Sequence, residues 1–83
     1  MISEKNAVKA EMLSRLLELK DYPAVKELIR GELAPDVAEI LGQIPEKQLP
    51  VIFRLLGKET AAEIFVEMSP EAKEYLIDSF TDS

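Results

Sequence analysis

The sequence predicts an all-α domain in which short helices stack as a solenoid. Apolar residues recur at helical spacing, strand-like alternation is absent, and Pro and Gly divide the 83 residues into segments of roughly 9 to 17 residues. The apolar pattern also returns after a shift of 24 residues, which indicates a structural repeat. We therefore expect about six short helices in three hairpin repeats of 24 residues, within a single domain over residues 1–83.

The first predicted helix runs from about residue 3 to residue 19. Ser3 is a suitable N-cap, because its hydroxyl can accept a hydrogen bond from a backbone N–H of the first turn. Apolar residues at helical spacing form the expected buried face, namely Val8, Met12, Leu13, Leu16 and Leu17.

The second and third predicted helices each begin close to a proline. Asp21 has the form of an N-cap, Pro23 falls in the first turn, and Gly31 ends the second helix. The third helix starts at Pro35 and carries apolar residues up to Ile44. The residues expected to be buried in these helices are Val25, Leu28, Ile29, Val37, Ile40 and Leu41.

The fourth predicted helix lies between Pro45 and Gly57. Pro50 conflicts with a regular helix there, because proline lacks a backbone N–H and clashes with the carbonyl four residues back. Either the helix begins late, near Gln48, or its first turn is kinked. Its expected buried residues are Leu49, Ile52, Phe53 and Leu56.

The fifth predicted helix covers about Glu59 to Glu67, and the sixth begins at Ser69 as N-cap followed by Pro70. Their expected buried residues are Ala61, Ile64, Phe65, Met68, part of Tyr75, Leu76, Ile77 and Phe80. Since a hairpin of 24 residues cannot bury its own apolar face, each repeat must pack against a neighbour.

The last repeat carries Leu76, Ile77 and Phe80 almost to the end of the chain. Two interpretations remain open. These side chains form an interaction surface, which a partner or a further repeat of a longer chain would cover, or they pack back on the fifth helix.

The composition excludes several classes of function. The chain has no Cys and no His, so structural zinc sites, disulfides and thiol or imidazole catalysis are ruled out. Its net charge of −6 opposes binding to nucleic acids and anionic lipids. No apolar run reaches the ~20 residues of a membrane span, so we expect no direct membrane insertion. With no glycine-rich phosphate loop and no activated nucleophile, we expect a protein that is not an enzyme.

Negative charge is concentrated in the last third of the chain. Residues 1–56 hold nine acids and eight bases, whereas residues 57–83 hold seven acids and two bases. Glu59, Glu63 and Glu67 are spaced to form one stripe on the fifth helix, with no base three or four residues from Glu63 or Glu67. The stripe is either a solvated surface or half of a site for a hard cation such as Mg²⁺, completed by another surface.

Five segments, taken in order, resemble the amino-terminal cytoplasmic domain of the MgtE family of magnesium transporters. They are Leu33–Leu41, Ile44–Glu46, Leu55-Leu56, Thr60–Phe65 and Met68–Glu71, and the likeness extends over about residues 10 to 80. Pro50 departs from the family pattern.

This resemblance implies a right-handed superhelix, followed in the longer polypeptide by a further helical repeat, paired CBS domains and a dimeric membrane pore. Magnesium bound between the cytoplasmic domains would hold the closed state, so the domain would act at the cytoplasmic face as a Mg²⁺ sensor. The expected partners are the CBS domains of the same polypeptide or of its dimer mate. The family's cation-associated carboxylate falls on Glu63. We expect weak Mg²⁺ binding by this chain alone, roughly millimolar or weaker, because few ligands are present.

A different class of function remains open. Short-helix repeats of this kind resemble the interaction modules of flagellar motor-switch and stator-assembly proteins. On that interpretation the domain is a scaffold for protein–protein contacts and needs no cation.

Overall fold

The computed structural model describes residues 3–81, and all regular structure in this range is helical. The elements are α1 (Glu4–Glu18), α2 (Tyr22–Ile29), α3 (Ala34–Leu41), the 3₁₀ helix η1 (Glu46–Gln48), α4 (Leu49–Leu55), α5 (Lys58–Val66) and α6 (Pro70–Thr81). The predicted all-α class with six α-helices is confirmed.

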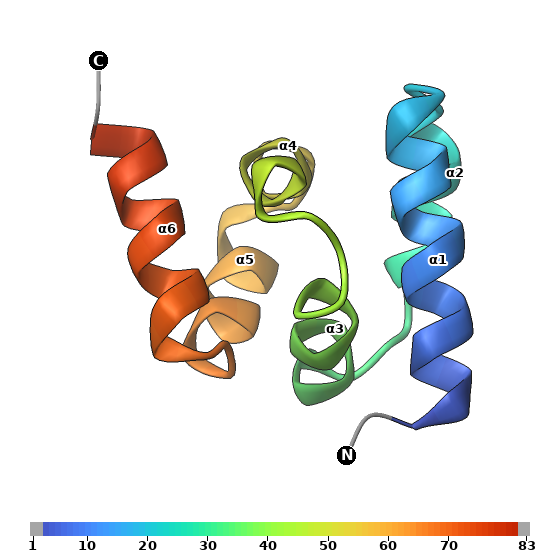
Figure 1. Ribbon diagram of the computed structural model, residues 1–83, viewed down its shortest axis with the longest axis horizontal. Helices are drawn as coiled ribbons and strands as arrows, with labels where there is room; N and C mark the ends of the chain where they lie inside the picture. The colour runs from blue at the N-terminus through green and yellow to red at the C-terminus, as the bar shows by residue number, and fades with distance from the viewer. Residues whose placement is uncertain (1–2, 82–83) are drawn as a thin grey trace.

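The helices follow one another across the molecule as three successive pairs (Figure 1). Helix α1 packs against α2 and α3, α3 packs against α5, and α4 packs against α6. The first helices of the three pairs thus form one row, α1–α3–α5, as expected for stacked hairpins. The radius of gyration is 11.8 Å, and the extents are 33 × 28 × 22 Å. A compact domain of this length has about the same radius, so three repeats form a compact body rather than an extended rod. The right-handed sense of the superhelix stays a prediction.

Side chains cap three helices at the predicted positions. The Ser3 hydroxyl accepts the backbone N–H of Asn6 at 3.2 Å, and the Asp21 carboxylate accepts that of Ala24 at 3.4 Å. The Ser69 hydroxyl caps α6 in the same way. Gly31 has φ = +82°, a left-handed conformation that costs glycine little, and it turns the chain from α2 into α3.

The conflict at Pro50 is resolved by a late helix start. Residues 46–48 form the 3₁₀ helix, and α4 begins at Leu49 with Pro50 in its first turn. A proline is tolerated at this position because the first backbone N–H groups of a helix have no partner within it.

The core draws on every α-helix. Its buried apolar residues are Ala10, Leu13, Leu17, Val25, Ile29, Val37, Ile40, Leu41, Ile44, Leu49, Ile52, Ile64, Met68 and Leu76. All of the residues expected to be buried in the second to fifth predicted helices are at least partly so. None of the helices within residues 3–81 has the length and apolar character needed to cross a membrane.

The prediction for α1 was partly wrong. Leu13 and Leu17 are buried, but Val8 and Met12 are 52% and 49% exposed. The buried face instead combines these leucines with Ala10 and Asn6. Val8 lies about two and a half turns before Leu17, so the two side chains point to opposite sides of the helix. The buried residues of α1 all lie on the Leu17 side, and α1 packs against α2 and α3, so the Val8 side faces solvent.

Candidate functional site

A polar cluster around one buried amide joins the first repeat to the second, where α1 packs on α3. The Asn6 side-chain amide donates to Asp36 Oδ1 at 3.3 Å and to Glu39 Oε1 at 3.1 Å. The backbone N–H of Ser3 donates to the same Glu39 oxygen at 2.8 Å. Asn6 is only 3% exposed. We call these four residues the first junction.

Hydrogen bonds at this junction favour the charged form of Glu39. The backbone N–H of Ser3, followed by the Asn6 amide, lowers the pKa of the Glu39 carboxyl below its ordinary value. Two further contacts hold α1 in place nearby. Lys9 forms an ion pair with Glu32, which also lowers the pKa of Glu32, and the buried Gln48 exchanges hydrogen bonds with α1.

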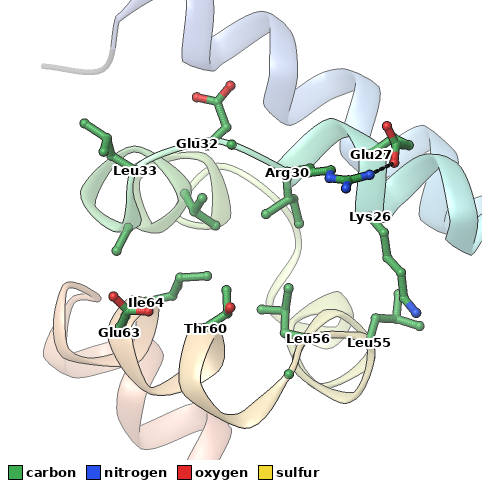
Figure 2. Close-up of a pocket in the computed structure, with 15 residues that line it drawn as sticks. Lys26, Glu27, Arg30, Glu32, Leu33, Leu55, Leu56, Thr60, Glu63 and Ile64 are labelled. Carbon is green, nitrogen blue, oxygen red and sulfur yellow. Dashed lines mark hydrogen bonds and ion pairs between the residues drawn. The ribbon is translucent and has the colours of Figure 1, made fainter.

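The repeat shift relates this cluster to a second set of residues. Adding 24 to 6, 36 and 39 gives Arg30, Thr60 and Glu63, which we call the second junction, where α3 packs on α5. All three side chains are exposed. They line an open groove of about 620 Å³ between the α2–α3 turn and the segment from α4 into α5 (Figure 2).

The groove is open because α3 lacks the amino-terminal extension that its counterpart α1 has. Helix α3 begins at Ala34, and the corresponding position one repeat of 24 residues earlier is Ala10. Helix α1 instead begins at Glu4, six residues before that position. These additional residues lie over α3 and supply Asn6. At the second junction the corresponding residues 28–33 form the end of α2 and the turn at Gly31. Within residues 3–81, no helix therefore extends over Thr60 and Glu63 from that side.

The groove has an apolar floor and charged rims. Ile29, Val37 and Ile64 are buried beneath it, Leu55 and Leu56 are half-buried in its walls, and Leu33 is 70% exposed at its edge. Lys26 and Glu63 lie toward opposite ends in the view of Figure 2.

The charged rims are only partly neutralised. Arg30 Nη1 donates to Glu27 at 3.1 Å, and both of these side chains are largely exposed. Glu32 is paired with Lys9. Within residues 3–81, neither Lys26 nor Glu63 has an ion-pair partner.

The acidic stripe predicted on α5 is exposed to solvent. Glu59, Glu63 and Glu67 are all exposed, but only Glu63 lines the groove. Along a helix, residues eight apart are separated by about 12 Å, so these three carboxylates cannot converge on one ion. Within residues 3–81, no three acidic side chains come close enough to hold a metal. A cation at Glu63 would need ligands from another surface.

The interaction surface predicted on α6 must be corrected at one residue. Leu76 is 2% exposed and belongs to the core, so it is not available to a partner. Ile77 and Phe80 are 52% and 51% exposed, which contradicts their assignment to the core but leaves them accessible. Neighbouring positions 76 and 77 differ because a helix turns by about 100° per residue.

Sequence reasoning singled out Glu63 but missed the other groove residues. Arg30 and Lys26 belong to no motif, and Thr60 stood out only as the start of a segment that resembles the family. The self-comparison matched Glu39 with Glu63, because Ala38–Leu41 recurs as Ala62–Phe65, but it compared no other polar position of the groove. Extending that comparison to the remaining polar residues also pairs Asn6 with Arg30 and Asp36 with Thr60. That pairing would have marked the second junction as the place where the polar pattern of the repeat changes.

The sequence matches the family described as MgtE intracellular N domain over residues 34–83. This range includes α3 to α6, Thr60 and Glu63, whereas α1 and α2 precede it. No curated protein and no solved structure matches the chain. Because the match extends over more than half of its residues, the chain belongs to the MgtE intracellular N domain family.

Proposed function

We propose that this domain is the cytoplasmic regulatory domain of a magnesium transporter or channel, and that it senses Mg²⁺ through Glu63. Family membership supports the connection to magnesium transport. One structural observation carries the proposal for the residue. Glu63 is an exposed carboxylate beside a groove, and within residues 3–81 it has no ion-pair partner.

The charge distribution supports a bridging role for the cation. Residues 57–81 hold six acids and two bases, and one of these bases, Lys73, lies over the Phe65 ring at 5.7 Å from its centroid. An acidic surface of this kind repels a second acidic surface. Mg²⁺ usually takes one or two protein carboxylates and keeps several waters, so it can join two surfaces that each supply one ligand.

The second half of the site would come from CBS domains of the same polypeptide or of its dimer mate. Mg²⁺ would then favour the arrangement in which the two surfaces meet, because only that arrangement offers ligands from both sides. Glu59 and Glu67 would strengthen the local negative potential without binding the ion directly.

Mg²⁺ titration of the 83-residue chain, followed by ¹⁵N NMR, tests the first part of this proposal. We expect millimolar or weaker binding, with the largest shifts around Glu63, and loss of those shifts in Glu63→Gln. Glu18→Gln is the matched control, since Glu18 is an exposed helical carboxylate on α1. Micromolar affinity of this chain alone would contradict a site that needs a second surface.

Protease protection tests the second part, with the CBS region added. Mg²⁺ should protect the parent protein and should fail to protect Glu63→Gln. Equal protection of both proteins would show that Glu63 is only a surface acid.

A protein–protein scaffold is the second candidate, and the apolar floor of the groove favours it. A scaffold would bind its partner equally well with EDTA and with Mg²⁺. Binding assays in the two conditions therefore separate the candidates.

A further inference from the structure

We propose that the groove at the second junction binds the amino-terminal turn of a helix from a partner protein, and that an amide or cationic side chain of that turn donates to Glu63. This contact requires no metal ion, so it goes beyond the proposed Mg²⁺ sensing.

The first junction shows how such a turn binds to this fold. There the first turn of α1 packs on α3, and its backbone N–H at Ser3 and its Asn6 amide both donate to one oxygen of Glu39. Glu63 occupies the corresponding position on α5, one repeat later. The groove beside Glu63 is the place where the corresponding helical turn is missing.

The surface of the groove suits a short amphipathic segment. Its floor consists of buried apolar side chains, and Leu33, Leu55 and Leu56 present further apolar atoms on its walls and edge. An apolar side chain next to the donor would pack against these leucines, and its burial would favour binding.

The charges that remain in the groove match the start of a helix. Glu27 is paired with Arg30, and Glu32 is paired with Lys9. The other charged groove residues are Glu63 and Lys26, at opposite ends. Glu63 offers an acceptor for the donor side chain and for free backbone N–H groups. Lys26 would face an acidic side chain, which first turns often carry because it stabilises the helix start.

A peptide of residues 3–18 is a suitable probe, because α1 fills the corresponding position within the molecule. It is added, blocked at both ends, to the ¹⁵N-labelled chain in EDTA. We expect shifts at the amides of Leu33, Leu56, Thr60 and Glu63. The same peptide with Asn6→Ala should bind about tenfold more weakly, because it lacks a hydrogen bond to a charged acceptor.

Substitutions in the protein separate this contact from nonspecific association. Glu63→Ala should weaken binding by about the same tenfold factor. Glu67→Ala changes an exposed acid at the C-cap of α5, outside the groove, and should leave binding unchanged. Leu33→Ser should also weaken binding, and it is expected to fold normally because Leu33 is 70% exposed.

Three results would overturn the proposal. The first is the absence of chemical-shift changes at the groove up to millimolar peptide, and the second is equal binding by Glu63→Ala and the parent. The third is chemical-shift changes confined to Asp36 and Glu39, which would mean that the peptide merely displaces α1. Because EDTA is present throughout, a negative result leaves the Mg²⁺ proposal intact, and loss of Mg²⁺ binding leaves this one intact.

Discussion

The two junctions of this domain have corresponding positions in the repeat but different structures. At the first, the amide of Asn6 is buried against two carboxylates, whereas at the second its counterpart Arg30 is exposed and paired with Glu27. The difference arises because α1 begins six residues earlier within its repeat than α3 does within the next one. A repeat in sequence therefore conserves the stacking of helices but not the contacts made at their ends.

Substitutions of buried isoleucines should give the largest effect, and they test whether both junctions enclose the core equally well. Ile40 and Ile64 are counterparts, 2% and 1% exposed. Replacing a buried isoleucine by alanine costs about 2–5 kcal/mol, and the cost is smaller where the site can relax or admit water. We expect Ile40→Ala to lower the free energy of unfolding more than Ile64→Ala, by roughly 1 kcal/mol, since Ile64 lines the groove. Urea denaturation measures both, and equal losses would mean that the groove does not loosen the second junction.

Removing the donor at each junction should give the next largest effect. Asn6→Ala leaves the carboxylates of Asp36 and Glu39 without their amide donor, at a cost of about 1–3 kcal/mol. Arg30→Ala, the matched control, breaks only an exposed ion pair and should cost less than about 0.5 kcal/mol. Thermal unfolding of the two variants compares them directly. A comparable loss in both would show that the first junction is not the tighter one.

Acidification should weaken the first junction. Hydrogen bonds from Ser3 and Asn6 lower the pKa of Glu39 in the folded state. Its contribution to stability is therefore complete above the ordinary carboxyl value of 4.5 and is lost as the pH falls through the lower folded-state pKa. Glu39→Gln should show a smaller loss of stability between neutral and acidic pH. Urea midpoints across that range measure it, and Glu63→Gln should keep the parent's response, because it leaves the Glu39 contacts in place.

The smallest effect concerns the acidic stripe on α5. Glu67→Lys places a base four residues after Glu63 and removes a like-charge neighbour, which should stabilise the helix by about 0.2–0.5 kcal/mol. The melting temperature should rise slightly at low salt and return toward that of the parent at high salt. Glu18→Lys on α1 is a control outside the stripe. No salt dependence of the gain would argue against repulsion along α5.

Most local features of this protein were predictable. Proline, glycine and capping residues marked the helix ends, and the 24-residue repeat predicted three helix pairs. The cap at Ser69 and the late start of α4 at Leu49 follow from interactions within a few residues of the chain. Such interactions can be read directly from neighbouring positions.

The candidate site was predictable only in part. Glu63 was identified through the family resemblance, and the family match includes it. The groove beside it was not predicted, because it depends on where α1 and α3 begin within their repeats and on the turn at Gly31. Those are differences between repeats, whereas the self-comparison searched for similarities.

The sequence alone determined the helices and their order, because helical spacing, caps and breakers act over a few residues. The tertiary structure decided which side of α1 is buried and which of Leu76, Ile77 and Phe80 remain accessible. Helix α1 carries apolar residues on two faces, so periodicity could not choose between them. Its partners α2 and α3 made that choice, through contacts that join residues as far apart as Asn6 and Glu39.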